Sequence, residues 1–178
     1  MSAKAKEILS TSLYFLIVLI ISLLIVKFVG QRTEVIGNSM KNTLHDGDNL
    51  ILNKISYRFS DPERFDIVVF PFRNGEKKNY IKRVIALPGE TIQIDDEGVI
   101  YINGEVLEEH YGREVILDPG SAAEPITLGE DQYFVLGDNR NDSNDSRFGE
   151  VKLVSRDEII GKVWIRIWPL KDFGKVDK

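Results

Sequence analysis

The sequence predicts an all-β domain of mostly antiparallel strands behind a single N-terminal transmembrane helix. Two observations favour this fold. Residues 8–26 form one uncharged, strongly apolar stretch. After residue 30, apolar residues stand in short runs or alternate with polar residues, and turn-forming residues bound each run. No stretch in this later part of the sequence has the long 3.6-residue period of an amphipathic helix.

The apolar stretch is long enough to cross a membrane, since about twenty residues span a ~30 Å hydrocarbon core. A cleaved signal peptide would end in small residues of the Ala-x-Ala type, and residues 28–34 contain no such triplet. A core helix of a soluble protein would have a polar face, and this stretch has none. We therefore predict a retained anchor over residues 8–29, preceded by a short segment, residues 1–7.

The charges around the anchor are nearly balanced, because two lysines precede it and Lys27 and Arg32 follow it. Residues 31–178 hold all but three of the 23 Lys and Arg and all but one of the 28 Asp and Glu, a formal charge of −7. The anionic cytoplasmic leaflet does not attract so acidic a domain. This favours a cytoplasmic N-terminus and an extracytoplasmic β-domain over residues 30–178.

Several runs in the β-domain are predicted as strands, namely 66–70, 91–94, 99–102, 133–136 and 162–168. The second and third of these flank a turn at 95–98 and form a predicted hairpin. Asn103-Gly104 predicts a further tight turn. Residues 155–160 are a candidate for a single helical turn. Residues from about 95 to 130 are rich in Glu, Gly and Pro and are predicted as a surface excursion from the main sheet.

Composition excludes several classes of function. The chain has no cysteine, which rules out disulfides, cysteine-ligated zinc, iron–sulfur clusters and a thiol nucleophile. Two histidines are too few for a three-histidine metal site in one chain. A formal net charge of −5 argues against bulk binding of nucleic acid. We accordingly expect no cofactor, no metal and no nucleic-acid partner.

The first candidate for chemistry is the segment from Gly37 to Asp48, just after the anchor. Ser39 is either an ordinary turn serine or a nucleophile, and a nucleophilic serine needs a neighbouring base. A lipase-type elbow is excluded because it would require glycine in place of Lys41. His45, six residues further on, would be the base of a triad, but it lies in a polar turn, and His110 lies in an acidic stretch.

The second candidate is the predicted strand around Lys82-Arg83. Strand alternation places each of these two side chains among apolar neighbours on its own face. A lysine that serves as a base near pH 7 needs a pKa about 3 units below its ordinary value, or roughly 4 kcal/mol. Only a buried, dry site supplies that shift. The alternative is a lysine that reaches past the sheet edge into water.

The third candidate is the polar segment 137–149. It is not a calcium loop of the EF-hand type, since position 6 is Ser143 instead of glycine and position 12 is Gly149 instead of glutamate. Asp145 and Arg147 are instead expected to form a charge pair that orders the segment.

Taken together and in this order after one membrane helix, the three segments resemble the type I signal peptidases, in the compact single-anchor form of Gram-positive bacteria. The motifs that carry the resemblance are Ser39-Met-Lys-Asn-Thr-Leu followed by Gly47-Asp48, Lys82-Arg-Val-Ile-Ala-Leu-Pro-Gly-Glu90 and Gly137-Asp-Asn-Arg-Asn-Asp-Ser-Asn-Asp-Ser-Arg147. The resemblance extends over nearly the whole chain and implies a β-domain of signal-peptidase type.

The resemblance implies a role for each residue of the site. Ser39 would be the nucleophile and Lys82 the general base of a Ser-Lys dyad, and Ser143 would orient the Lys82 amine. A salt bridge between Asp145 and Arg147 would support the dyad, with Asp138 in the same buried polar network.

Two residues depart from the family pattern. The Ser39 backbone N–H would hold the oxyanion, but the hydroxyl donor that some members carry two residues earlier is Gly37 here. The motif's proline is Asn42 here, and because asparagine also suits turns we expect a similar, less rigid path.

The implied function is that of a membrane-anchored serine endopeptidase that removes signal peptides from secreted preproteins. It would cut after Ala-x-Ala-like sites through an acyl-enzyme, with the lipid bilayer and the preproteins as partners.

Two other functions are alternatives to this one. A self-cleaving repressor-type Ser-Lys protease would carry a DNA-binding domain in place of the anchor. A non-catalytic relative that assists pilus or surface-protein assembly would be expected to lack Ser39 or Lys82. A sortase is excluded by the missing cysteine.

Overall fold

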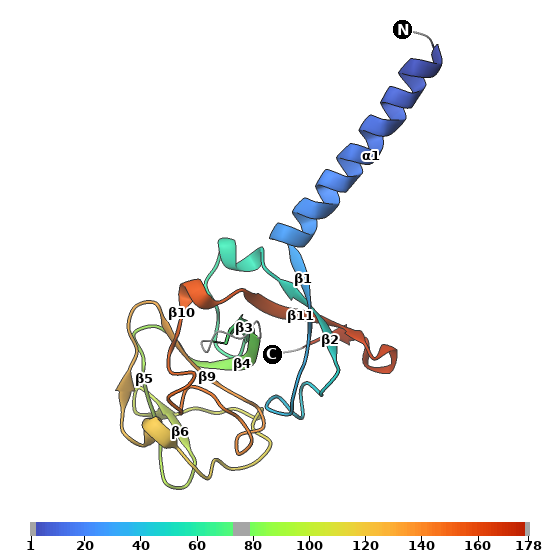
Figure 1. Cartoon of the computed structure of the whole chain (residues 1–178). Coiled ribbons are helices and arrows are strands. Elements are labelled where there is room, and N and C mark those ends of the chain that lie inside the picture. The colour runs from blue at the N-terminus through green and yellow to red at the C-terminus, as the bar shows by residue number, and fades with distance from the viewer. Residues whose placement is uncertain (1–2, 73–78, 177–178) are drawn as a thin grey trace.

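The computed structural model describes residues 3–72 and 79–176. Helix α1 (Ala3–Phe28) projects away from a β-rich body, and the side chains described along it are exposed (Figure 1). Within the described residues, one segment, Lys6–Leu24, is long and apolar enough to cross a membrane. The anchor over residues 8–29 and its orientation stay predictions.

The rest of the described chain is built mainly of antiparallel strands, which confirms the predicted all-β class. The larger sheet has the order β1-β2-β11-β3-β4-β9-β10, with β12 paired to β11. Its strands are β1 (Gly30–Glu34), β2 (Asn49–Asn53), β3 (Ile67–Pro71), β4 (Asn79–Ala86), β9 (Gln132–Leu136), β10 (Val154–Ser155), β11 (Gly161–Trp168) and β12 (Gly174–Lys175). Short 3-10 turns are η1 (Ser56–Arg58), η2 (Gly120–Ala123), η3 (Arg156–Glu158) and η4 (Leu170–Asp172).

A second sheet of four strands has the order β7-β6-β5-β8. It consists of β5 (Thr91–Ile94), β6 (Ile100–Ile102), β7 (Glu105–Val106) and β8 (Ile126–Thr127). The predicted hairpin is β5–β6, and the predicted turn at Asn103-Gly104 joins β6 to β7 with φ of 53° and 83°. Positive φ at both central residues is what a tight two-residue hairpin turn requires.

The prediction of a surface excursion at about 95–130 was incomplete. Ile116, Ala122 and Leu128 from this region are buried in one hydrophobic cluster with Ile92 and Phe134. The region therefore completes a hydrophobic core between the two sheets, because its scattered apolar residues come together only once the chain folds back on β5. The sequence of this region has no periodic pattern from which its part in the core could be predicted.

Strand β4 is the element that positions the site. From Ile81 to Ala86 every side chain is buried, although the side chains alternate between the two faces. The strand pairs with β3 on one side, and on the other side its pairing with β9 begins only at Arg83. Residues 79–82 thus keep one backbone edge that is unpaired within the described sheet.

Candidate active site

Ser39 lies in a turn that follows β1, which we call the Ser39 turn (residues 37–47). Met40 and Leu44 on the turn are buried in the core cluster of β2, β3 and β4, which anchors the turn to the sheet. The Asp46 carboxylate accepts the Gly37 backbone N–H at 2.7 Å. Gly37 has a φ of +92°, which suits glycine because it has no Cβ. Ser39 is therefore presented from a turn that is held at both ends.

The expected path at Asn42 was wrong. Asn42 has a φ of +100°, whereas a proline ring fixes φ near −65°. The Ser39 turn consequently follows a course at this position that the motif's proline could not adopt. Asparagine is among the few residues with a side chain that tolerate this region of backbone space.

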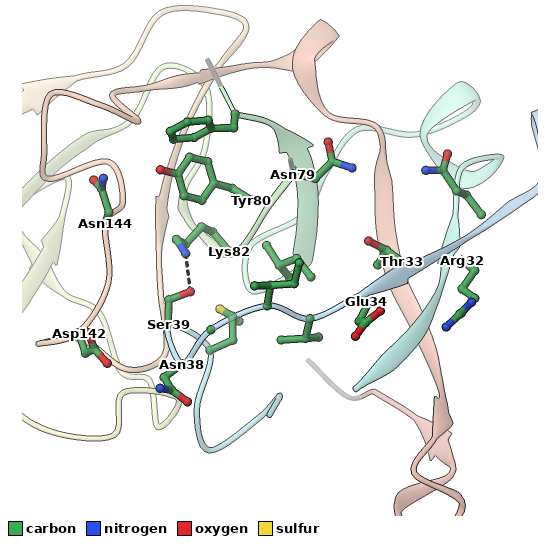
Figure 2. A pocket seen from close by; sticks show the side chains of 17 residues that line it. Arg32, Thr33, Glu34, Asn38, Ser39, Asn79, Tyr80, Lys82, Asp142 and Asn144 are labelled. Atoms are coloured by element: carbon green, nitrogen blue, oxygen red, sulfur yellow. Dashed lines mark hydrogen bonds between the residues drawn. The ribbon is translucent and has the colours of Figure 1, made fainter. Parts of the chain in front are cut away.

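The structure joins Ser39 to Lys82. The Lys82 Nζ lies 2.6 Å from the Ser39 Oγ, although 43 residues separate the two in sequence (Figure 2). Lys82 stands on β4 opposite Val68 of β3, and its side chain is 1 % exposed. The Tyr80 ring covers the amine, with its centroid 5.2 Å from Nζ. This lysine is buried, as the dyad prediction required, and does not reach past the sheet edge.

Burial lowers the pKa of Lys82 from its ordinary value to about 8. Desolvation is the largest cause, because removing an ammonium from water penalises the charged form. Asp145 and Asp138 act in the opposite direction and raise this pKa, while Arg147 lowers it. With a pKa near 8, about a tenth of the amine is neutral at pH 7, which is enough for a working base.

Asp145 and Arg147 form a buried ion pair on the 137–147 loop. The Arg147 Nε lies 2.8 Å from Asp145 Oδ1, and its Nη2 lies 2.9 Å from Oδ2. Asp145 also accepts the Gly137 N–H at 3.1 Å, and Arg147 donates to the Arg140 carbonyl. A two-point pair of this kind fixes geometry as well as charge. It holds the loop beside the dyad.

Asp138 belongs to a separate ion pair. Its two carboxylate oxygens accept from Arg83 Nε at 2.9 Å and Nη2 at 2.7 Å. Thr43 Oγ1 donates to the same carboxylate at 2.5 Å. The predicted single polar network therefore divides into two. Sequence reasoning did not count Arg83 or Thr43 among the site residues. The signal for Arg83 was a charge on an apolar strand face, which requires a buried partner.

Ser143 lies close to the nucleophile but does not make the expected hydrogen bond to the Lys82 amine. Its Oγ is buried and has no hydrogen-bond partner among the described residues. A Cβ added at Gly137 would fall 2.2 Å from the Ser143 Oγ and 2.5 Å from the Ser39 carbonyl oxygen. The serine thus packs against Gly137, beside the Ser39 backbone. The hydrogen bond of Lys82 goes to Ser39 instead.

The backbone of the Ser39 turn also binds the 137–147 loop. Asn139 donates its backbone N–H to the Ser39 carbonyl at 3.0 Å and its side-chain amide to the Asn38 carbonyl at 3.1 Å. Gly37 offers no side-chain donor for an oxyanion, and its N–H is already bound by Asp46. The role of the Ser39 N–H as the donor to an oxyanion stays a prediction.

A cleft of about 780 Å³ leads to the dyad. One wall is β1 and the residues that follow it, and the opposite wall is the beginning of β4 (Figure 2). Among the described strands, β1 stands at the edge of its sheet and pairs with β2 alone. Its outer edge and the unpaired edge of residues 79–82 therefore both offer backbone groups to an extended peptide.

Within the described residues, no group of three or more histidine and carboxylate side chains is placed to hold a metal ion. His45 contributes its backbone N–H to Asp48, at 2.9 Å. The hydrogen-bond partner of the Ser39 hydroxyl is the lysine, not this histidine.

A serine hydroxyl within hydrogen-bond distance of a buried lysine amine, beside a cleft on an antiparallel β-domain, is an arrangement that suits a serine peptidase. The comparisons with known proteins agree with that class. The family model for signal peptidase, peptidase S26, matches residues 8–168. The chain belongs to this family, which confirms the resemblance drawn from the three motifs.

Two curated relatives illustrate the match. The chain is 40% identical over 152 residues to a probable signal peptidase I-2 of Synechocystis sp., covering 83% of this chain and 67% of the relative. It is 42% identical over 160 residues to a signal peptidase I of Bacillus caldolyticus, covering 83% and 84%. A solved signal peptidase I of Enterococcus faecalis V583 aligns at 35% identity, over 58% of this chain and 97% of that one, with a TM-score of 0.47.

Proposed function

We propose that this protein removes signal peptides from secretory preproteins, with Ser39 as nucleophile and Lys82 as general base. The observation that carries the proposal is the 2.6 Å contact between Ser39 Oγ and a Lys82 amine that burial keeps partly neutral. No histidine or carboxylate is needed to activate the serine when a neutral amine lies within hydrogen-bond distance.

The reaction follows from this geometry. Neutral Lys82 takes the Ser39 proton as Oγ attacks the scissile carbonyl, and the Ser39 N–H stabilises the oxyanion. The protonated lysine then gives its proton to the leaving amine, and an ester forms between the signal peptide and Ser39. Lys82 next takes a proton from water, which attacks the ester and releases the signal peptide. Proton return to Ser39 restores the dyad.

The other residues of the site support the dyad. The Asp145–Arg147 pair orders the 137–147 loop, and the Arg83–Asp138 pair joins this loop to β4. The buried hydroxyl of Ser143, for which the described part of the chain holds no hydrogen-bond partner, is available as an acceptor once Lys82 carries the proton. The burial of these groups also keeps water from the amine, which is the condition for its lowered pKa.

The substrate lies in the cleft as an extended strand between the edges of β1 and β4. Backbone pairing supplies affinity in this mode of binding, and pockets for alternate side chains supply selectivity. Ile36, Met40 and Ile81 bring large apolar side chains to the cleft. A cleft already lined by large side chains suits small residues such as alanine before the scissile bond, as in Ala-x-Ala.

The membrane arrangement completes the proposal. Helix α1 spans the bilayer with its N-terminus in the cytoplasm, and the β-domain lies outside. Ser39 follows the last residue of α1 by only eleven positions, so the dyad stays near the membrane surface. A substrate held by its own apolar signal segment shares that surface, which raises its effective concentration at the cleft.

Cleavage of a preprotein by the detergent-solubilised full chain tests this function. Ser39→Ala and Lys82→Ala should abolish release of the mature product, whereas Ser60→Ala and Lys171→Ala, at exposed positions, should cleave like wild type. Lys82→Arg should also be inactive, because a guanidinium stays charged. Equal product from all variants would disprove the dyad. A wild type that cuts none of several preproteins would favour the assembly-factor alternative.

A further inference from the structure

The cleft has two ends that are lined by different residues, and the dyad lies near one of them (Figure 2). Arg32 and Glu34 mark the end next to α1, since β1 begins two residues after the helix. Asp142, Asn144 and Asn38 line the other end, beyond Ser39. The cleft therefore runs from the helix side, along β1, past the nucleophile and onto the 137–147 loop.

The direction of a bound preprotein follows from the proposed function, on which this inference rests. The apolar part of the signal peptide stays in the bilayer beside α1, so the residues before the scissile bond lie along β1. The residues after the scissile bond, which begin the mature protein, must leave past Ser39. The side chains at that end therefore face the first residues of the mature chain.

Asp142 is the charged side chain among the described residues that line this exit. Its carboxylate is exposed, and the hydrogen bond recorded for it is a long one of 3.5 Å from the Asn139 side-chain amide. No ion pair is recorded for it within the described part of the chain. The charge is thus available to a passing substrate.

The position of Asp142 is fixed relative to the nucleophile. Its backbone N–H donates to the Asn139 carbonyl at 3.0 Å, and the Asn139 N–H donates to the Ser39 carbonyl at 3.0 Å. Asn139 also holds Asn38 through its side chain, at 3.1 Å. One short chain of hydrogen bonds therefore links the Asp142 backbone to the Ser39 turn, so this residue keeps its place at the exit while its exposed carboxylate faces the solvent.

We propose that Asp142 is a specificity-determining residue, which favours basic over acidic side chains at the first positions of the mature protein. A carboxylate at a fixed backbone position beside the cleft attracts a cationic substrate side chain and repels an anionic one. Because the site is open to water, the effect is moderate and screened by salt. We expect a three- to tenfold preference in kcat/KM for lysine over glutamate at low ionic strength.

Cleavage of synthetic peptides by the full chain in detergent tests the proposal. Each peptide contains one Ala-x-Ala site and carries Lys, Gln or Glu at one of the first three positions after it. For wild type, at least one position should show the preference, and 0.5 M NaCl should reduce it. Asp142→Asn should abolish the preference, and Asp142→Lys should reverse it, while the Gln peptides remain substrates.

Glu34→Gln is the matched control, because it removes the same charge from the opposite end of the same cleft. It should leave the lysine-to-glutamate ratio unchanged, and an equal shift would show that net charge, not Asp142, sets the preference. Wild type that cuts the Gln peptides without any charge preference would overturn this inference alone. Failure to cut even the Gln peptides would overturn the proposed function as well.

Discussion

Arg83 and Asp138 are joined by two hydrogen bonds of 2.9 and 2.7 Å, and both side chains are almost completely buried. Arg83 directly follows Lys82 on β4, and Asp138 begins the 137–147 loop. The Tyr111 ring covers the guanidinium, with 3.8 Å from its centroid to Cζ. The pair therefore joins β4, the strand that carries Lys82, to the 137–147 loop beside Ser39.

Removing one partner of this pair should destabilise the protein strongly. Asp138→Ala leaves the Arg83 guanidinium buried and uncompensated, which costs about 3–5 kcal/mol. Urea unfolding of the full chain in detergent measures the loss. Asp61→Ala is the matched control, since Asp61 is paired with Arg156 but is 83 % exposed, and its removal should change stability little. Equal effects of the two changes would contradict the structural role of the buried pair.

Asn42 gives a prediction that runs against the family motif. Asn42→Pro restores the motif residue, but it should lower the melting temperature and the cleavage rate because φ at this position is +100°. A backbone forced away from its favoured region costs about 1–3 kcal/mol. Asn42→Gly keeps the left-handed path and should match or exceed the stability of wild type. Higher activity in Asn42→Pro than in wild type would show that the turn follows the path of the motif instead.

Asp46 should act on catalysis through the turn before Ser39. Its carboxylate holds the Gly37 N–H at 2.7 Å, so Asp46→Ala frees the turn and should lower kcat about tenfold with little change in KM. Asp46→Asn retains an acceptor oxygen and should recover most of the rate. If the two variants are equally active, the hydrogen bond does not position the nucleophile.

Much of the fold was predictable because strands and turns leave local signals. The β5–β6 hairpin and the turn at Asn103-Gly104 were predicted from alternation and turn residues alone. The apolar strand neighbours of Lys82 left two possibilities open, a buried lysine and one that reaches past the sheet edge, and the structure shows the buried one. The core between the two sheets was not predictable, since Ile116, Ala122 and Leu128 have no shared period in the sequence.

The missed contacts of the site share one physical cause. The partner of a buried charge depends on tertiary approach, and sequence spacing does not report it. Asp138 was expected near Asp145 and Arg147, on its own loop, but its carboxylate pairs with Arg83, 55 residues away. In the same way, an asparagine at position 42 indicates a turn, but it does not indicate which φ and ψ values the backbone adopts there.

The pH dependence of kcat/KM for the wild-type enzyme tests the central claim most directly. The neutral amine is the active form, and burial lowers the pKa of Lys82 to about 8. Activity should therefore level off above pH 9 and fall below pH 8, by about tenfold for each further pH unit. A profile that is flat from pH 6 to 9, or that bends near 6.5 as expected of an imidazole base, would contradict a Lys82 base.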